Sequence, residues 1–451
     1  MDQFFDLKEQ HPDTILFFRM GDFYELFHED AEVAAEVLGL SLTSRDKNAE
    51  QPIPMAGFPW HGLEEHLRTM LRAGYKVTVA EQEEELREGA KLLERVATRV
   101  YTPGSLYEEG LLDADEQSLL AAVVLGGEGL GLSVIDASTG RAWASTHHGP
   151  DRFIRLQDDL QRWQPSELVL SPSDAGDEHM GRLFLLLEGT MISQHNLSPT
   201  KRDERLRDML NVADLGHLDL DNAPLALSAT GLAADYLATV HMRKDVPLQD
   251  VEMVEETGHL LLDQTTLRNL ELTSTLAGEY DGSLLSSLNR CRTAMGRRLL
   301  KTWLLQPLAD PTAIETRHKA VGTLARSARR LDGLRTSLKG IRDMERLATQ
   351  LAYQRSNARD LVATAHALER MPAITQWCLD SQDALLMHLS KDLSSLGEMT
   401  SMIQATLADA PPLGLRDGGL LKSGVDEEVD ELRAATGEGK AWFSNLERQL
   451  R

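Results

Sequence analysis

The apolar residues of this chain change their spacing near residue 246, and this change limits the folds that the chain can adopt. Up to about residue 245, short apolar runs bounded by glycine and proline alternate with amphipathic stretches, as in domains that mix strands and helices. Beyond that point apolar residues recur at helical spacing and strand signals almost vanish. Because 451 residues exceed what one hydrophobic core usually organises, we expect several domains, the last of them helical.

The composition is that of a globular protein, with 42% hydrophobic and 26% charged residues. No apolar stretch approaches the ~20 residues that cross a bilayer, and the N-terminus lacks the basic and apolar segments of a secretory signal. Two cysteines, Cys291 and Cys378, are too few for a disulfide framework or a cysteine-based zinc site. We therefore expect a soluble cytoplasmic protein without a membrane partner.

The net charge of -24 argues against an extended grip on nucleic acid. A sequence-independent hold on phosphates normally needs clustered lysine and arginine. Acidic residues outnumber basic ones even within the first hundred residues. Any contact with DNA is therefore expected to be local and shape-driven, or to be completed by a partner chain.

Three stretches that differ in the spacing of their apolar residues set the expected domain boundaries. The first, residues 1–105, is predicted to be mixed α/β, and the second, residues 116–245, to be a three-layer α/β domain. Residues 246–427 are predicted to form mostly long helices, and residues 428–451 a charged helical run that is interpreted as truncated. The expected strands are residues 15–18, 23–27, 40–43, 75–80, 119–124, 131–136 and 167–170, and the expected helices include residues 29–38 and 151–163.

The segment from Phe17 to Phe27 contains two predicted strands joined at Gly21 and Asp22. Phe23 and Glu25 stand two residues apart on the second strand, so their side chains share one face. An aromatic ring in this position can insert at a poorly stacked base step, and the carboxylate can bond the displaced base. The alternative is that Phe23 is a core residue and Glu25 the polar side of an edge strand.

The same segment resembles the mismatch-wedge motif of the MutS family. The resemblance continues through residues 52–61, Glu81-Gln82 and residues 99–104. It implies that Phe23 is the stacking wedge and Glu25 the base-bonding acid. It also implies that four further residues flank the mismatch or contact the DNA backbone, namely Met20, Asp22, Arg45 and Arg95.

The helical region carries a second resemblance to this family, to its core and lever helices. It rests on residues 266–272, 293–308, 340–347 and 359–361. The resemblance thus covers essentially the whole chain and implies a multidomain α/β plus α fold. Its parts are a mismatch-recognition domain (1–105), an RNase H-like connector (116–245), a helical core and lever (246–427) and a truncated start of the lever and clamp region (428–451).

The function implied by the resemblance is recognition of mismatched or unpaired bases in double-stranded DNA at the start of mismatch repair. The family binds small loops as well as mismatches, acts as a homodimer and signals to a MutL-type partner. It also implies a bacterial, cytoplasmic protein associated with the nucleoid. Relatives that serve recombination generally lack the Phe-x-Glu pair, so its presence favours repair.

Complete members of the family carry a C-terminal ATPase with a Walker A loop that uses ATP and Mg²⁺. This chain contains no such loop. The nearest sequence, Gly437 to Lys440, has Ala434 at the first required glycine and Ala441 in place of the hydroxyl that binds Mg²⁺. We therefore expect no cofactor, no catalytic residue and no enzymatic activity within these 451 residues.

Two other functions compete with mismatch recognition. Asp136 ends a predicted strand, as the first metal ligand of RNase H-like nucleases does, so a metal-dependent nuclease is one alternative. A helical interaction scaffold without DNA function is the other, and the acidic charge favours it. His61 is interpreted as a packed structural residue. One basic cluster can be read either as a DNA contact or as arginines on a packed helix, namely Arg290, Arg292, Arg297, Arg298 and Lys301.

Overall fold

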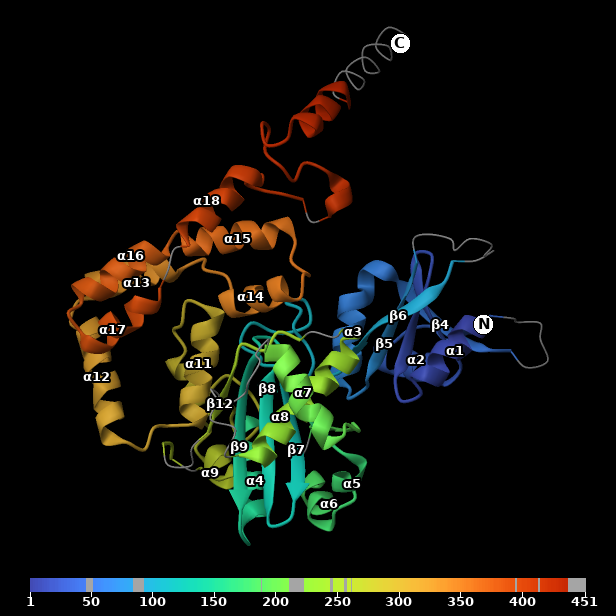
Figure 1. Ribbon diagram of the computed structural model, residues 1–451, viewed down its shortest axis with the longest axis horizontal. Helices are drawn as coiled ribbons and strands as arrows, with labels where there is room; N and C mark the ends of the chain where they lie inside the picture. Colours follow the sequence, from blue (N-terminus) through green and yellow to red (C-terminus); the bar gives the residue numbers. More distant parts are fainter. Residues whose placement is uncertain are drawn as a thin grey trace. The chain divides into compact units, whose positions relative to one another are not determined.

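The computed structural model describes residues 1–45, 52–83, 93–187, 189–210, 223–243, 246–254, 258–260, 262–393, 396–412 and 414–436 (Figure 1). The chain divides into two compact units. The first unit contains Met1–Arg290, Met295–Asp310 and Ala348–Tyr353, and the second contains Cys291–Ala294, Pro311–Leu347 and Gln354–Arg451.

A six-stranded sheet in the order β3-β4-β2-β1-β5-β6 organises the N-terminal part of the first unit. Strands β1 and β5 are parallel, and the other neighbouring pairs are antiparallel. The central strand β1 begins with four buried residues in succession, because helices cover both faces of the sheet. The strands are β1 Ile15–Met20, β2 Phe23–Phe27, β3 Thr43–Ser44, β4 Pro54–Pro59, β5 Val77–Gln82 and β6 Arg95–Tyr101.

Helices on the two faces of this sheet build two separate apolar clusters. Helix α1 (Asp2–Gln10) inserts Phe4 between Phe18 and Phe27, with ring centroids 5.8 and 5.1 Å away. Helices α2 (His28–Leu38) and α3 (Leu63–Arg72) pack on the opposite face. Side chains of β2 alternate between the two faces of the sheet. This alternation determines which β2 residues are exposed to solvent at the tip of the β1–β2 hairpin.

Most elements expected in the first hundred residues are confirmed. The paired strands at 15–18 and 23–27, the helix at 29–38 and the strand at 75–80 all lie within about two residues of the prediction. The strand expected at 40–43 is wrong in extent, because only Thr43–Ser44 pairs with β4. Strands β4 and β6 were not predicted, since prolines and charges interrupt their alternation.

The middle of the chain forms a second six-stranded sheet in the order β11-β10-β7-β8-β9-β12. The strands β7, β8 and β9 form an antiparallel meander, whereas β10, β11 and β12 join in parallel. This confirms the strands expected at 119–124, 131–136 and 167–170. The six strands are β7 Leu119–Gly126, β8 Gly129–Asp136, β9 Arg141–His148, β10 Glu167–Leu170, β11 Met191–Gln194 and β12 Asp250–Met253.

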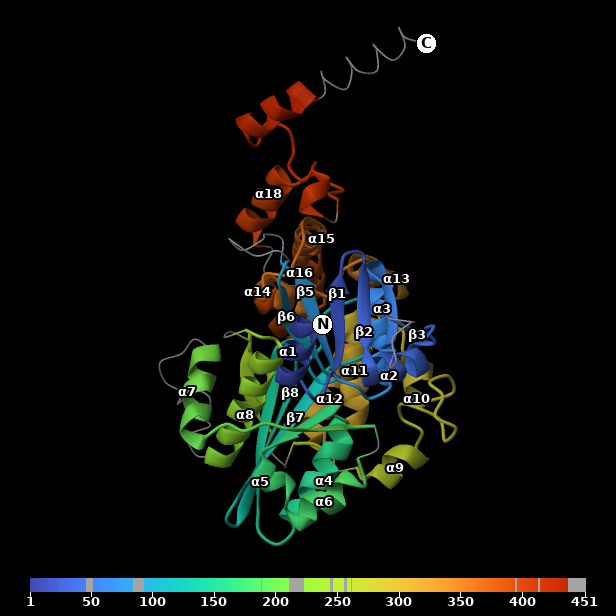
Figure 2. The same ribbon diagram turned by 90° about the vertical axis from the view of Figure 1, so that its right-hand side faces the viewer.

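Helices cover both faces of the second sheet, as Figure 2 shows for α8 on one side and α4 on the other. Helix α8 (Pro224–Val240) is rich in alanine and lies close to β8. A Cβ atom added at Gly131 would lie 2.0 Å from the Leu225 carbonyl oxygen, so only glycine permits this approach. The other helices are α4 Arg152–Trp163, α5 Pro172–Ala175, α6 Glu178–Phe184 and α7 Pro199–Leu210.

The segment Thr102 to Ser105 joins the two sheets through a buried carboxylate. Glu167 has no exposed surface and accepts hydrogen bonds from the hydroxyls of Tyr236 (2.5 Å) and Ser193 (2.5 Å) and from the Gly104 amide (3.2 Å). Such a carboxylate is tolerated in an interior because several donors replace its water. This network accounts structurally for the glycine of the 99–104 motif.

Beyond β12 the described regular elements are helices, but these helices are shorter than expected. The longest of them is α12, with 15 residues, and the helical spacing of apolar residues from Leu338 to Leu351 is interrupted at Gly340, which has φ +82°. Residues 427–436 are helical, whereas 437–451, including Gly437 to Lys440, lie outside the described residues. The helices are α9 Gln264–Asn269, α10 Leu284–Leu288, α11 Ala294–Leu305, α12 Pro311–Ala325, α13 Ala328–Leu338, α14 Met344–Ala352, α15 Ala358–Leu368, α16 Met371–Asp380, α17 Ala384–Leu389 and α18 Gly397–Thr406.

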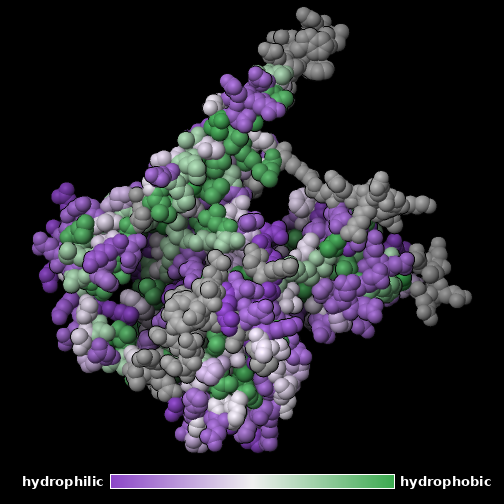
Figure 3. Space-filling model, viewed as in Figure 1, coloured by the Kyte–Doolittle hydropathy of each residue, from purple (hydrophilic) through white to green (hydrophobic). Residues whose placement is uncertain are grey.

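Surface hydropathy differs from element to element. Figure 3 shows apolar surface over helices of the second unit, where exposed apolar side chains include Leu396, Met402 and Leu415. In the described part of the chain, no helix has the length and apolar character needed to cross a membrane.

Candidate nucleic-acid interface

The tip of the β1–β2 hairpin carries the two residues singled out in the sequence. Gly21 adopts φ +59°, which lets the chain reverse tightly before Asp22. The register pairs Met20 with Phe23 and Phe18 with Glu25, so Phe23 and Glu25 share one face. Phe23 keeps 47% of its surface exposed, whereas its neighbour Tyr24 on the opposite face is 1% exposed. We call Phe23 and the half-buried Glu25 the wedge pair.

Helix α1 covers two phenylalanines of the hairpin and leaves Phe23 exposed. Phe4 closes over Phe18 and Phe27, which are 5% and 1% exposed. Phe23 is outside this cluster of α1. A large aromatic ring is thus presented at a tip whose backbone is fixed by pairing on both sides, to β1 and to β4.

The Glu25 carboxylate is half-buried and has space beside it. Among the described residues it has no hydrogen-bond or ion-pair partner. Its cross-strand neighbour in β4 is Gly57, where an added Cβ would lie 2.9 Å from the Tyr24 carbonyl oxygen. The glycine therefore permits close strand pairing and leaves the acid accessible. An unpartnered, partly desolvated carboxylate suits a ligand that brings its own donor.

Three of the four flanking residues lie at the same end of the sheet as the wedge pair. Met20 is the cross-strand partner of Phe23, and Asp22 is exposed in the turn. Arg95 begins β6, next to the end of β5. Its guanidinium is half-buried, lies 5.8 Å from the Phe18 ring centroid and donates to the Leu93 carbonyl oxygen at 2.8 Å.

The fourth flanking residue, Arg45, lies at the other end of the hairpin. It follows β3 and places its guanidinium 5.6 Å from the ring centroid of Phe27. Phe27 is four residues from Phe23 along β2, or about 13 Å at the usual rise of a strand. The structure therefore groups Met20, Asp22 and Arg95 with the wedge pair and sets Arg45 apart from them.

Two residues at the tip were not singled out by the sequence. Trp60 is 52% exposed, and its amide donates to the Asp22 carbonyl oxygen at 2.9 Å. The Arg19 guanidinium lies 5.3 Å from the ring centroids of both Trp60 and Tyr24. The sequence feature that could have singled out Trp60 was its position within the 52–61 motif. An exposed tryptophan is uncommon away from interfaces, so the exposure of Trp60 points to a binding surface.

The interpretation of His61 as a packed residue is wrong. His61 is exposed in the short 3₁₀ turn η1 (Trp60–Gly62), which follows β4. The histidine that packs is His66 of α3, whose ring centroid lies 4.2 Å from that of Phe58. Burial lowers the pKa of His66 below its usual value, so this ring packs in its neutral form.

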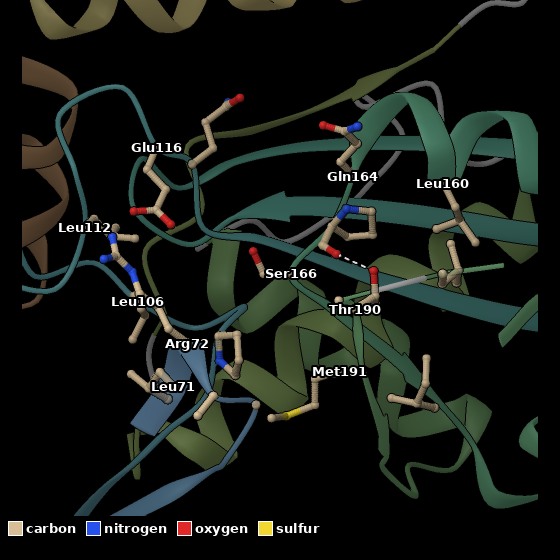
Figure 4. Close-up of a pocket in the computed structure, with 18 of the residues that line it drawn as sticks. Leu71, Arg72, Leu106, Leu112, Glu116, Leu160, Gln164, Ser166, Thr190 and Met191 are labelled. Carbon is tan, nitrogen blue, oxygen red and sulfur yellow. Dashed lines mark hydrogen bonds between the residues drawn. The ribbon is translucent and has the colours of Figure 1, made fainter. Parts of the chain in front are cut away.

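A cavity of about 1020 Å³ lies away from the wedge pair, where the two sheets' domains face each other (Figure 4). One wall comes from Leu71, Arg72 and the segment 106–117. The other comes from the ends of α4 and β11, where the Thr190 hydroxyl donates to the Pro165 carbonyl oxygen at 2.9 Å. Its lining mixes leucines with scattered polar groups and suggests no reaction.

The nuclease alternative finds no support at Asp136. This carboxyl is 1% exposed and accepts hydrogen bonds from the amide (3.0 Å) and hydroxyl (2.7 Å) of Ser138. Burial raises its pKa, and the Ser138 bonds oppose the shift. Among the described residues, no group of three or more potential metal ligands is present. Asp136 therefore closes a turn, and the part of the chain that the structure describes places no further carboxylates beside it for a two-metal site.

The basic cluster near α11 does not form one open surface. Arg298 is 4% exposed and donates to the Ala114 carbonyl oxygen at 3.3 Å. Lys301 is half-buried, and burial lowers its pKa, an effect opposed by Asp115 and Glu116. These two side chains are occupied inside the first unit, which favours packed arginines over a DNA contact at their positions.

Three family descriptions match successive parts of the chain. MutS domain I matches residues 1–110, MutS domain II residues 118–250 and MutS domain III residues 265–449. The chain belongs to the MutS family. The wedge pair lies in the MutS domain I match, Asp136 in the domain II match and helix α11 in the domain III match.

Similar proteins are named DNA mismatch repair protein MutS in widely separated organisms. The chain is 38% identical to that of Symbiobacterium thermophilum over 459 residues, which is 100% of this chain and 52% of the relative. It is 37% identical to that of Synechococcus elongatus (99% and 52%) and 32% identical to that of Methanococcoides burtonii (100% and 52%). The chain spans about half the length of these MutS relatives and corresponds to their N-terminal portion.

Proposed function

We propose that this chain recognises mismatched or unpaired bases in double-stranded DNA and so initiates mismatch repair. The observation that carries the proposal is the wedge pair: an exposed phenylalanine and a carboxylate with no partner among the described residues, on one face of a hairpin tip that is paired on both sides. The names of the MutS relatives agree with it. A protruding sheet tip suits a duplex groove better than a small molecule, which normally binds in a concave pocket.

The ring of Phe23 would discriminate through the cost of unstacking. Insertion of an apolar side chain at a base step costs roughly a few kcal/mol and kinks the duplex. The cost is smaller where pairing is already defective, so a fixed ring selects mismatches over paired steps. A ring on a mobile loop would lose this selectivity, because the loop could yield before the bases do.

The carboxylate of Glu25 would supply the polar part of recognition. A negative charge near DNA repels phosphates, so this residue penalises any complex in which no base donor meets it. A displaced base offers imino and amino donors, which a carboxylate accepts. Such a bond is charge-assisted and hence stronger than a neutral one.

The flanking residues would place the duplex around the wedge pair. We propose that Met20 and Asp22 border the mismatch and that Arg95 and Arg45 approach the backbone on either side of β2. Arg45 lies two strands from β2 and Arg95 three, or about 10 and 14 Å at the usual strand spacing. With a net charge of -24, few phosphates are neutralised, so binding relies on shape more than on charge.

The remaining family functions are proposed for the protein to which these domains belong. We propose that the chain divides into four parts, namely residues 1–105, 116–245, 246–427 and 428–451. The second of these, residues 116–245, is proposed to be an RNase H-like connector. The meander β7-β8-β9 followed by parallel β10 supports that connector fold. The same proposal has four further parts. They are use of ATP and Mg²⁺, homodimerisation, signalling to a MutL-type partner, and a place in the bacterial cytoplasm near the nucleoid.

The test is binding of the full chain to matched and G·T-mismatched duplexes at one fixed salt concentration. Wild type should prefer the mismatch, and Phe23→Ala should lose that preference by roughly tenfold, equivalent to about 1.4 kcal/mol. Tyr75→Ala is the matched control, because Tyr75 is also an exposed aromatic residue but precedes β5 at the opposite end of the sheet.

Two results would contradict the proposal. One is a folded wild-type chain with no preference for mismatched DNA, and the other is a preference that survives in Phe23→Ala. Either result would favour the alternative of a helical interaction scaffold, which the acidic charge already suggests.

A further inference from the structure

The reverse side of the wedge hairpin carries a polar arrangement that the proposed function does not use. Tyr24 lies between Phe23 and Glu25 in sequence and points to the opposite face, where its ring packs against Phe58 at a centroid distance of 5.5 Å. It is 1% exposed, yet its hydroxyl lies at the border of the apolar cluster. A buried tyrosine hydroxyl needs a partner, and its identity determines what Tyr24 is anchored to.

That partner is Glu81 of β5, two strands away from β2. The Tyr24 hydroxyl donates to Glu81 Oε1. The bond therefore crosses the central strand β1, a span of about 9.6 Å at the usual strand spacing. Burial, with Glu81 alongside, raises the pKa of Tyr24 above its usual value, so the hydroxyl remains a donor at physiological pH. A bond to a carboxylate is roughly twice as strong as one between neutral groups.

The residue crossed by this bond is Arg19, which pairs directly with Tyr24 in the β1–β2 ladder. Its guanidinium lies 5.3 Å from the Tyr24 ring centroid, and its Nε donates to the Gly21 carbonyl oxygen at 2.5 Å. Arg19 thus joins the turn itself to the tyrosine. We call Arg19, Tyr24 and Glu81 the strap, because together they tie the hairpin turn to the far strand β5.

The strap matters because apolar packing does not fill the space beneath the turn. A cavity of about 680 Å³ opens there, and its lining includes all three strap residues together with Gly21, Asp22 and Trp60. A turn supported by a full core resists displacement through van der Waals contact. Here the polar strap and strand pairing provide the support instead.

We propose that Tyr24 and Glu81 are positioning residues for the wedge pair, holding the hairpin turn so that Phe23 cannot retreat when it meets stacked bases. The inference rests on the proposed function and goes beyond it, since both side chains lie on the face of the sheet opposite the wedge pair. It also gives the Glu81-Gln82 motif a role. When the Phe23 ring contacts a paired base step, either the bases unstack or the hairpin turn is displaced. Discrimination against paired DNA requires that the turn keep its position.

The experiment uses the full chain and the substitution Tyr24→Phe, which removes the hydroxyl and keeps the ring in the core. The ratio of the Kd for matched duplex to the Kd for G·T duplex should fall about fivefold, which is less than the full loss of one charge-assisted hydrogen bond because only part of that loss reaches the mismatch preference. Glu81→Ala should do the same, whereas Glu81→Gln, which keeps an acceptor oxygen, should retain most of the preference. Tyr75→Phe is the matched control and should leave the ratio unchanged.

A second readout separates the strap from the proposed function. Amide hydrogen exchange at residues 19–25 should become faster in Tyr24→Phe and remain at the wild-type rate in Tyr75→Phe. Unchanged exchange in Tyr24→Phe overturns the strap whatever the DNA result, and so does an unchanged mismatch preference. Absence of any preference in the wild-type chain overturns the proposed function, and the exchange rates then still decide the strap.

Discussion

Gly57 is the single residue on which the geometry of the wedge pair depends most directly. An added Cβ would lie 2.9 Å from the Tyr24 carbonyl oxygen, in backbone that cannot rotate away. Gly57→Ala should therefore force β2 and β4 apart and destabilise the first domain by about 1–3 kcal/mol. Hydrogen exchange of peptides from β1 and β2 in the full chain measures this loss as a reduced free energy of opening.

The control for that substitution is Gly181→Ala in helix α6. A Cβ at Gly181 meets no atom within 4 Å, and alanine is the better helix former by about 1 kcal/mol. This variant should be neutral or slightly stabilised in α6. Equal protection of β2 in Gly57→Ala and wild type would show that the strand accommodates the methyl group, and would refute the steric argument.

Individual residues were predictable from the sequence where only the alternation of one strand was needed. The shared face of Phe23 and Glu25 follows from that alternation alone. The bond from Tyr24 to Glu81 does not, because it joins residues 57 positions apart and depends on the parallel register of β1 and β5. The wrong prediction for His61 also arose because strand alternation does not determine tertiary contacts. The short turn η1 determines that His66, and not His61, packs on Phe58.

Helix α1 is the element that buries Phe18 and Phe27 of the hairpin. Phe4 is 2% exposed and contacts the rings of Phe5, Phe18 and Phe27. Phe4→Ala should leave a cavity and cost about 3–5 kcal/mol. Hydrogen exchange of α1 and β1 in the full chain measures the change.

The neighbouring Phe5 supplies the comparison for Phe4. Phe5 is 49% exposed, so Phe5→Ala removes the same ring from a half-exposed position. Its cost should stay below about 1 kcal/mol. Similar losses in the two variants would mean that α1 is anchored by its general apolar character and not by insertion of Phe4 into the sheet.

Elements were predictable where a long apolar run or a glycine marked them. The strand at 119–124 is a continuous apolar run and the strand at 131–136 is a largely apolar one next to a glycine-rich turn, and they are confirmed as β7 and β8. Strand β9 was not predicted, because its residues include arginine, two histidines and a tryptophan, and only sheet pairing makes them a strand. The helical region was predicted in type but not in length, since Gly340 ends a pattern that periodicity alone continues.

At the scale of the whole molecule, the first unit is held together by buried polar junctions as well as by its cores. His241 follows helix α8, and its Nε2 donates to the Ser105 carbonyl oxygen at 2.8 Å. The Tyr353 hydroxyl donates to Nδ1 of the same ring at 2.9 Å. A neutral imidazole satisfies both bonds, so the link between residues 105 and 353 depends on the protonation state of one histidine.

Burial, together with Arg99 and Arg243, holds the pKa of His241 well below its usual value near 6.5. Below pH 6.5 His241 is therefore protonated in the unfolded chain but stays neutral in the folded chain. The free energy of unfolding consequently falls as the pH drops through that value. Between pH 7.5 and 5.5 this one group should cost about 1.4 kcal/mol. Urea denaturation of the full chain at both pH values, followed by tryptophan fluorescence, measures the loss.

His241→Gln isolates the contribution of this ring from those of the other histidines. The glutamine amide keeps a donor for Ser105 and does not titrate, so the variant should be less stable at pH 7.5 but should lose about 1.4 kcal/mol less than wild type on acidification. His179 is 59% exposed in its side chain, and His179→Gln should follow the wild-type profile. If His241→Gln and wild type lose the same stability between the two pH values, the junction tolerates a charged imidazole and His241 is not what makes the first unit sensitive to acid.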